Sequence, residues 1–102
     1  MRIIKPSTLA RWTMEFPQSR IHLEAWLPIV KHAKWKTYLD VRQSFPGTDP
    51  VKVASGKRVY VFNFIGNAYR MICAIHFNTG KVFMLRFMTH ANYSKEQWKN
   101  EL

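Results

Sequence analysis

The fold of this chain is decided by residues 58–88, which read RVYVFNFIGNAYRMICAIHFNTGKVFMLRFM. A period of two runs through this stretch, with many β-branched and aromatic side chains, as in strands that pack on a core. Two turn sequences interrupt it, Gly66-Asn67 and Asn78-Thr79-Gly80, and both are typical of tight hairpins. The stretch therefore predicts three antiparallel strands over Arg58–Ile65, Ala68–Phe77 and Lys81–Met88.

The two turns also fix which residues face each other across the strands. The predicted pairs are Asn63 with Arg70, Ile72 with Arg86, Arg70 with Met88, His76 with Val82 and Phe77 with Lys81. One face of the sheet then carries an unbroken apolar layer, which we expect to be the core: Tyr60, Phe62, Phe64, Tyr69, Met71, Cys73, Ile75, Phe77, Phe83, Leu85 and Phe87. The other face carries Val61, Asn63, Arg70, Ile72, Arg86 and Met88.

The residues before this stretch have the period of α-helices instead. Leu9, Trp12 and Phe16 form one apolar stripe, with Ser7 as a candidate N-cap. The predicted elements are a brief strand at Arg2–Lys5, helices over residues 8–16 and 20–34 with a kink at Pro28, a short helix from Thr37 to Ser44, a turn-rich connection over 45–50, and a last helix from Ser94 to about Glu101. The chain is thus expected to be a single α+β domain over residues 1–102. Its N-terminal helices pack on one face of a small antiparallel meander, and a short helix ends it.

Composition narrows the class of protein. Sixteen Lys and Arg against six Asp and Glu give a net charge of +10, and 47% of the residues are hydrophobic. So much apolar surface excludes a disordered tail, and one cysteine excludes an internal disulfide. We find no apolar run of the roughly 20 residues that a transmembrane helix needs and no signal-peptide core. We therefore expect a soluble, cytoplasmic, membrane-free protein with a polyanionic partner.

The opposite face of the meander holds a candidate anion site. Arg70 and Arg86 are diagonal neighbours there, Asn63 lies beside them, and residues 58–88 contain no acidic side chain. Taken singly, each arginine is equally compatible with a solvated face; the pair favours a phosphate ligand. His90 and Tyr93 follow just past the last strand and offer proton transfer, and the phenol can also stack on a base. Arginine near a phenol also lowers its pKa.

This set of side chains is what metal-free RNA cleavage requires: positive charge for the phosphorane, a base for the 2′-hydroxyl and an acid for the leaving oxygen. No Cys and His residues have metal-ligand spacing, so we expect neither a metal nor another cofactor. Which of His90 and Tyr93 is the base and which the acid stays open at this point. A structural role for His90 is an alternative.

The same residues resemble a known family. Residues 61–70 and 85–93, together with Trp26, residues 33–36, 44–46 and 98–100, are similar to the HigB toxins of bacteria, in the wider RelE-like group. The resemblance implies a RelE-like fold and a ribosome-dependent endoribonuclease that cuts translated mRNA in the A site. It also implies neutralisation by a HigA antitoxin with a helix-turn-helix domain, through which alone the toxin reaches operator DNA.

Carried over by residue, the resemblance makes Arg70, Arg86, His90 and Tyr93 the catalytic candidates. RelE-like sites often add lysines ahead of the first meander strand. The RNA-binding candidates are accordingly Lys52, Lys57 and Arg58, with Asn63 beside the arginines. Pro28 departs from the pattern expected in the second helix.

Two other functions use the same basic surface. A non-catalytic RNA-binding or ribosome-binding protein needs the arginines but no proton carrier, so His90 and Tyr93 favour cleavage over binding alone. A DNA-binding module ranks last, because no helix-turn-helix pattern is visible and the cationic pair lies on a sheet.

Overall fold

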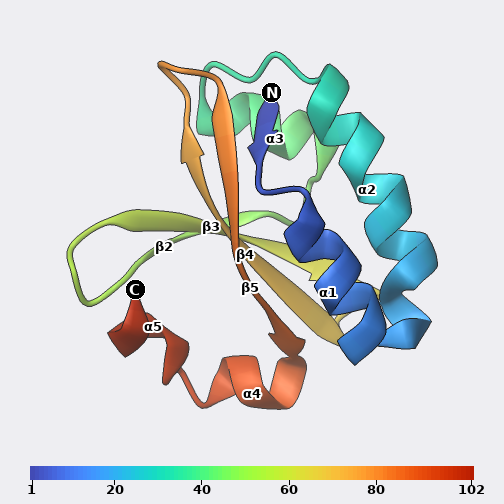
Figure 1. Cartoon of the computed structure of the whole chain (residues 1–102). Coiled ribbons are helices and arrows are strands. Elements are labelled where there is room, and N and C mark those ends of the chain that lie inside the picture. The colour runs from blue at the N-terminus through green and yellow to red at the C-terminus, as the bar shows by residue number, and fades with distance from the viewer.

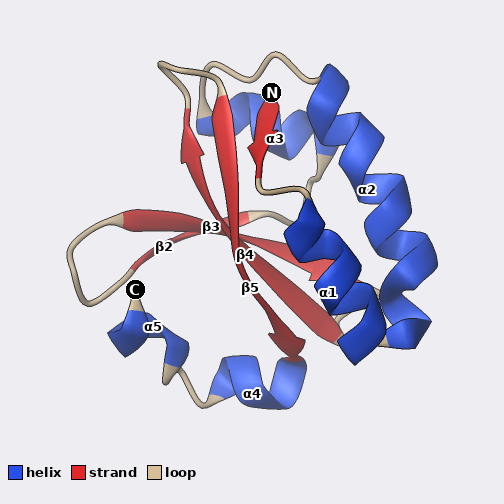
Figure 2. Cartoon of the chain, in the orientation of Figure 1, coloured by secondary structure: helices blue, strands red, loops and turns tan.

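The computed structural model describes all residues, 1–102, as a mixed five-stranded sheet with helices on both faces (Figures 1 and 2). The strand order is β1-β5-β4-β3-β2, in which β1 pairs parallel to β5 and the other neighbours are antiparallel. The strands are β1 (Arg2–Ile4), β2 (Asp49–Lys52), β3 (Arg58–Phe64), β4 (Tyr69–His76) and β5 (Lys81–Thr89). The α+β class and the three strands of the meander are therefore confirmed.

The helices lie mostly in the first half of the chain, as the helical period predicts. They are α1 (Ser7–Glu15), α2 (Arg20–His32), α3 (Tyr38–Ser44), α4 (His90–Ser94) and α5 (Trp98–Glu101), with a 3-10 turn at Pro17–Ser19. The N-cap of α1 is Pro6 without a side-chain bond, so the prediction of Ser7 as cap is wrong. Thr37 and Asp40 form a capping box that starts α3. The second helix runs through Pro28 without a break.

The main core lies between α1, α2 and one face of the sheet, and Figure 1 shows both helices on the same side of β5 and β4. It contains 17 buried residues. Its aromatic rings pack edge to face, for example Trp26 on Phe62 with centroids 5.6 Å apart and Phe45 on Phe62 at 5.3 Å. These geometries suit the ring quadrupoles, so the aromatic residues of the sheet stabilise the docked helices beyond their buried area. No helix is both long and apolar enough to cross a bilayer.

The first hairpin has the predicted register. Asn63 pairs with Arg70, and the Ala68 N–H donates to the Ile65 carbonyl at 3.1 Å around Gly66-Asn67. Gly66 has a φ of +62°, a left-handed conformation that costs glycine little.

The second hairpin differs from the prediction by one residue at its turn. His76 pairs with Lys81, and neither the predicted pair of Phe77 with Lys81 nor that of His76 with Val82 forms. A β-bulge restores the register further along, because Cys73 pairs with Met84 while Ile72 pairs with Arg86. The pairs of Ile72 with Arg86 and of Arg70 with Met88 are confirmed.

The bulge changes which side chains of β5 reach the core. A shift of one residue exchanges the two faces of a strand. Val82 and Met84 are buried in the main core. Leu85 packs on the opposite side of the sheet, and the Phe83 ring lies 4.9 Å from the His76 ring. Placing Phe83 and Leu85 in the main core was therefore wrong.

Two further elements differ from the prediction. Asp49 and Pro50, predicted as the end of a turn-rich connection, instead begin the edge strand β2, which pairs with Arg58–Val61. Pro50 is tolerated because an edge strand has one unpaired side. The last helix, predicted from Ser94, begins only at Trp98 and has no side-chain cap. A further short helix, α4, precedes it and ends at Ser94; its cap is Thr89, which accepts from the Asn92 N–H at 3.3 Å.

The C-terminal helices cover the face of the sheet opposite α1 and α2. In Figure 1, α4 and α5 run back from the end of β5 beneath the sheet. Trp98 is buried there in a second cluster with Val53, Val59, Val61 and Ile72. Its Nε1 donates to the Tyr93 carbonyl at 3.0 Å, and the Lys99 carbonyl accepts from the Ala54 N–H at 3.0 Å. This face is therefore a second small core.

Candidate active site

Arg70 projects from β4 toward the face covered by the C-terminal segment, beside the start of α4. Only 9% of it is exposed. Its Nη1 donates to the Asn67 carbonyl at 3.0 Å and to the Tyr69 carbonyl at 3.4 Å. Its guanidinium carbon lies 5.3 Å from the centroid of the Tyr93 ring. The hairpin turn and α4 thus hold this arginine in one orientation.

Arg86 lies one diagonal step from Arg70 on the same face, because Ile72 pairs with Arg86 while Arg70 pairs with Met88. Its Nη1 donates to the Leu85 carbonyl at 2.8 Å, and its Nε lies 3.5 Å from Glu101 Oε1. The side chains of Arg86 and Glu101 are 40% and 58% exposed. Unlike Arg70, this guanidinium is open to an incoming anion, and it already binds a carboxylate.

Tyr93 and His90 lie on α4, directly after β5. The His90 N–H donates to the Ala68 carbonyl at 2.9 Å, which ties the start of α4 to the first hairpin, and its side chain is exposed. The Tyr93 ring stacks on Trp98 with centroids 5.3 Å apart. Burial raises the pKa of the Tyr93 phenol, and Lys99 and Arg70 offset this only in part. Arg70 lowers this pKa, as expected, but burial outweighs it, so the net shift is upward.

The RNA-binding candidates divide into two places. Asn63 lies across from Arg70, but its Nδ2 donates to the Gly47 carbonyl at 3.2 Å. Lys52 and Arg58 pair with each other at the other end of the sheet, next to Lys57. Asn63 lies five positions along β3 from Arg58, about 17 Å at roughly 3.3 Å per residue. The structure therefore brings Arg70, Arg86 and Tyr93 together but keeps these three cations apart from them.

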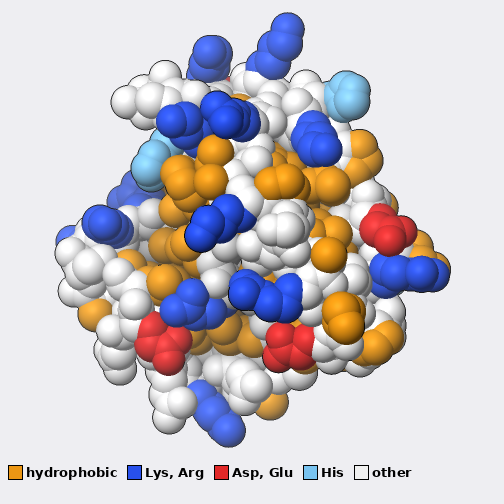
Figure 3. All heavy atoms as spheres, viewed as in Figure 1, with side chains coloured by type: hydrophobic (Ala, Val, Ile, Leu, Met, Phe, Trp, Pro, Cys, Tyr) orange, Lys and Arg blue, Asp and Glu red, His pale blue; other side chains and the backbone are white.

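Among the charged residues of the chain, basic ones predominate, with 16 Lys and Arg against six Asp and Glu. Figure 3 shows Lys and Arg side chains spread over the face seen there, with few acidic ones among them. Lys57 and Arg58 line a groove of about 440 Å³ together with His76, Leu85 and Leu102. A polyanion could therefore contact both ends of the sheet at once.

Comparison with known proteins places the chain in a family. The sequence profile described as HigB toxin, the RelE-like toxic component of a toxin-antitoxin system, matches residues 19–96. The chain belongs to the HigB toxin family. The resemblance seen in residues 61–70 and 85–93 is thereby confirmed.

Three proteins that resemble this HigB-family chain carry related names. It is 26% identical over 95 residues to the mRNA interferase HigB of Escherichia coli O6:H1, covering 93% of this chain and 90% of that protein. It is 27% identical over 93 residues to the mRNA interferase toxin HigB of Escherichia coli K12, covering 91% and 88%. The same values hold for the mRNA interferase HigB of Shigella flexneri.

Sequence reasoning left out two residues that contact the candidate site. Glu101 pairs with Arg86 and Trp98 stacks on Tyr93, and both come from α5. A signal for such a cover was present: Val59, Val61 and Ile72 are apolar on the face that was expected to bind anions. Three such side chains on one sheet face indicate that something packs on it.

The chain offers no obvious metal centre. No three His, Cys, Asp or Glu side chains lie together in a group that could hold a metal ion. Cys73 is fully buried and burial raises the pKa of its thiol far above the usual range, so it is an inert part of the core.

Proposed function

We propose that this chain is a RelE-like toxin that acts as a ribosome-dependent, metal-independent endoribonuclease on translated mRNA. Cleavage would proceed by attack of a ribose 2′-hydroxyl on the adjacent phosphate. One observation carries the proposal: Arg70 and Arg86 lie one diagonal step apart on the sheet, and Tyr93 packs against Arg70. Membership of a toxin family and the names of its relatives, all mRNA interferases, support the same activity.

The two arginines would divide the work of binding the phosphate. Arg86 is the more exposed, so it would contact the scissile phosphate and stabilise the charge that develops on the phosphorane. Arg70 is nearly buried and fixed by two carbonyls, so it would add positive potential and hold Tyr93 in place. A fixed cation stabilises a transition state without being reorganised during the reaction.

The proton carriers would be Tyr93 and His90. The raised pKa keeps the Tyr93 hydroxyl protonated at neutral pH, so it suits donation to the leaving 5′-oxygen. His90 is exposed at the start of α4 and would take the 2′-hydroxyl proton. The arrangement needs no metal ion.

The partners would be mRNA, the ribosomal A site and a HigA-type helix-turn-helix antitoxin, with operator DNA reached only through the antitoxin. Lys52, Lys57 and Arg58, at the far end of the sheet, would contact RNA phosphates outside the reacting centre. Such contacts release counterions, so binding to ribosomes should weaken steeply as salt is raised.

The proposal is tested by adding purified toxin to ribosomes that are translating a defined mRNA and mapping the cuts by primer extension. Arg86→Ala should lower the cleavage rate about 100- to 1,000-fold, while Arg86→Lys keeps part of it. Omitting ribosomes should abolish cleavage. Binding without cutting in the wild type would favour the non-catalytic RNA-binding alternative. Full activity of Arg86→Ala would contradict the assignment of this site.

Two further measurements address the proton carriers and the metal. Single-turnover cleavage by His90→Gln should be slower than cleavage by the wild type if His90 is the base; a wild-type rate between pH 5.5 and 8.5 would make it a structural residue. Cleavage should survive EDTA once the magnesium of the ribosome is restored. Activity that requires added Mn²⁺ or Zn²⁺ would contradict metal independence.

A further inference from the structure

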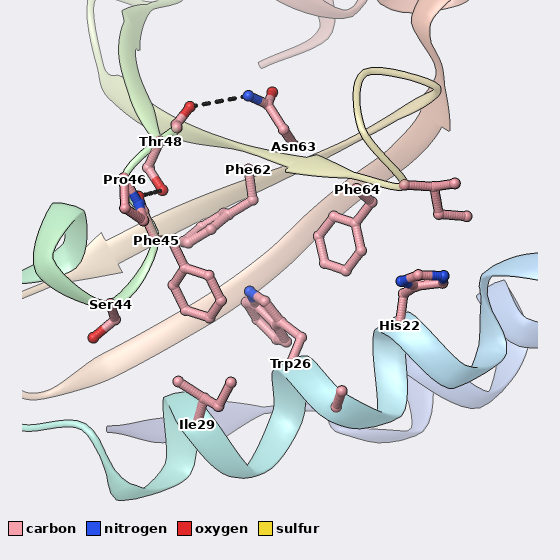
Figure 4. A pocket seen from close by; sticks show the side chains of 13 residues that line it. His22, Trp26, Ile29, Ser44, Phe45, Pro46, Thr48, Phe62, Asn63 and Phe64 are labelled. Carbon is pink, nitrogen blue, oxygen red and sulfur yellow. Dashed lines mark hydrogen bonds between the residues drawn. The ribbon is translucent and has the colours of Figure 1, made fainter.

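A groove lies between α2, the loop after α3 and the end of β3, separate from the two arginines (Figure 4). Its volume is about 320 Å³. The floor is aromatic, from Trp26, Phe62 and Phe64, which are all buried. Ile29 and Pro46 form part of the rim. β2 ends its pairing with β3 at Val61, so this part of β3 has no strand on that side.

The exposed side of α2 extends this groove along the surface. Ile21, Ala25 and Ile29 follow each other at a spacing of four residues and therefore lie on one face of the helix. Ile21 is 72% exposed and Ile29 is 47% exposed. The stripe spans eight residues, about 12 Å at 1.5 Å per residue. A solvent-facing helix side is ordinarily polar, so an apolar stripe beside an apolar groove indicates a docking surface.

The chemistry of the groove does not suit RNA. The chain has 16 Lys and Arg residues, yet none of them lines this groove. RNA phosphates need such cations. The aromatic rings of the floor are buried and offer no free face for a base to stack on. The groove instead suits apolar side chains of a protein.

Trp26 adds a polar requirement. Its indole Nε1 is buried without any hydrogen-bond partner. Buried donors of this kind are normally paired. Figure 4 shows the indole in the groove, with its nitrogen directed toward the side where Phe45 lies. A peptide carbonyl inserted beside Phe45 would supply the missing acceptor.

We propose that this groove and the α2 stripe bind an apolar segment of the antitoxin, so that neutralisation does not require filling the Arg70 and Arg86 site. The inference rests on the proposed toxin function, since that function requires an antitoxin. Charge favours an acidic antitoxin over a second copy of this chain, because two copies would bring together surfaces of +10 each. Asn63 borders both the groove and Arg70, so a docked segment would also add bulk beside the Arg70 and Arg86 site.

The test uses a HigA-type helix-turn-helix antitoxin as the probe, with its affinity for the intact chain measured by calorimetry. Ile29→Asp and Ala25→Arg change exposed residues of the stripe and should weaken binding roughly 30-fold or more. Leu39→Asp is the matched control, because Leu39 is an exposed apolar residue of α3, at 70%, outside the groove. It should bind as the wild type does. Thermal unfolding of each variant verifies its fold.

Cleavage of mRNA is measured on the same variants, so the two proposals can fail separately. Loss of antitoxin binding with unchanged cleavage by Ile29→Asp supports the docking surface. If the wild type binds the antitoxin but never cuts mRNA, and the variants lose binding, the docking surface is supported and the proposed function is contradicted. Unchanged affinity in Ile29→Asp and Ala25→Arg overturns the inference. The inference is also overturned if these variants lose only RNA binding, or only self-association as measured by light scattering.

Discussion

The two faces of the sheet are both apolar at their centres, but different parts of the chain cover them. The face under α1 and α2 belongs to a cluster of 17 buried residues. The face under α4 and α5 holds a cluster of 5, and its cover is the last segment of the chain. The proposed catalytic arginines lie at the edge of the smaller cluster. The larger face thus stabilises the fold, while the smaller one positions the site and can open at lower cost.

The largest loss of stability should come from a truncation in the larger face. Phe62→Ala removes a ring that is 1% exposed and contacts Trp26, Trp35 and Phe45. We expect a loss of about 3–5 kcal/mol in the free energy of unfolding, measured in urea. A loss under about 1 kcal/mol would mean that this face does not dominate stability.

A truncation on the smaller face should lower the free energy of unfolding less than Phe62→Ala does, even when a larger side chain is removed. Trp98→Ala should cost about 1–2 kcal/mol, because α5 can detach while the main core stays folded. Hydrogen exchange should show faster exchange at the Ala54 amide, which donates to the Lys99 carbonyl, and unchanged protection in β4. Global unfolding on the scale of Phe62→Ala would show that the two faces form one cooperative unit.

The pH dependence of stability should also report on the smaller face. The pKa of Tyr93 is raised by burial in the folded protein. Its contribution is therefore fully present below the unfolded pKa of about 10 and is lost as pH rises through the folded pKa. Tyr93→Phe should flatten the fall in stability between pH 9.5 and 11, measured in urea. Tyr60, whose pKa burial also raises, titrates from the larger face and serves as the comparison.

The smallest effect should come from the pair of Arg86 and Glu101. The pair is exposed, so Glu101→Gln should change the free energy of unfolding by less than about 1 kcal/mol. Removing the carboxylate should nevertheless raise RNA affinity, because an RNA phosphate then binds Arg86 without first displacing Glu101. The measurement is titration of RNA by fluorescence anisotropy at low salt, with Lys99→Gln as a control on a neighbouring charge. Weaker RNA binding by Glu101→Gln would contradict this competition.

Much of the fold could be predicted because its signals are local. The period of two in residues 58–88 and the sequence Gly66-Asn67 were enough to place Asn63 opposite Arg70. A hairpin is closed by its own turn, so no distant contact is needed to specify it.

The predictions that were wrong concern places where segments distant in the sequence meet. Asp49–Lys52 forms a strand only because β3 offers it an edge, and its own residues favour a turn. The bulge in β5 depends on packing along both sides of the strand, so the sequence of the turn did not reveal it. The divided last helix likewise follows from Trp98 docking on Val59, Val61 and Ile72.

By itself, the sequence determined the α+β class, the helix-covered core, the strongly basic surface and the pairing of Asn63 with Arg70. These depend on residue type, period and turns that act over a few neighbours. The tertiary structure decided that α4 and α5 cover the opposite face, that Tyr93 lies against Arg70, and that Glu101 pairs with Arg86. The reason is physical: these contacts join residues 15 or more positions apart, and only packing of the whole chain determines which of many such contacts form.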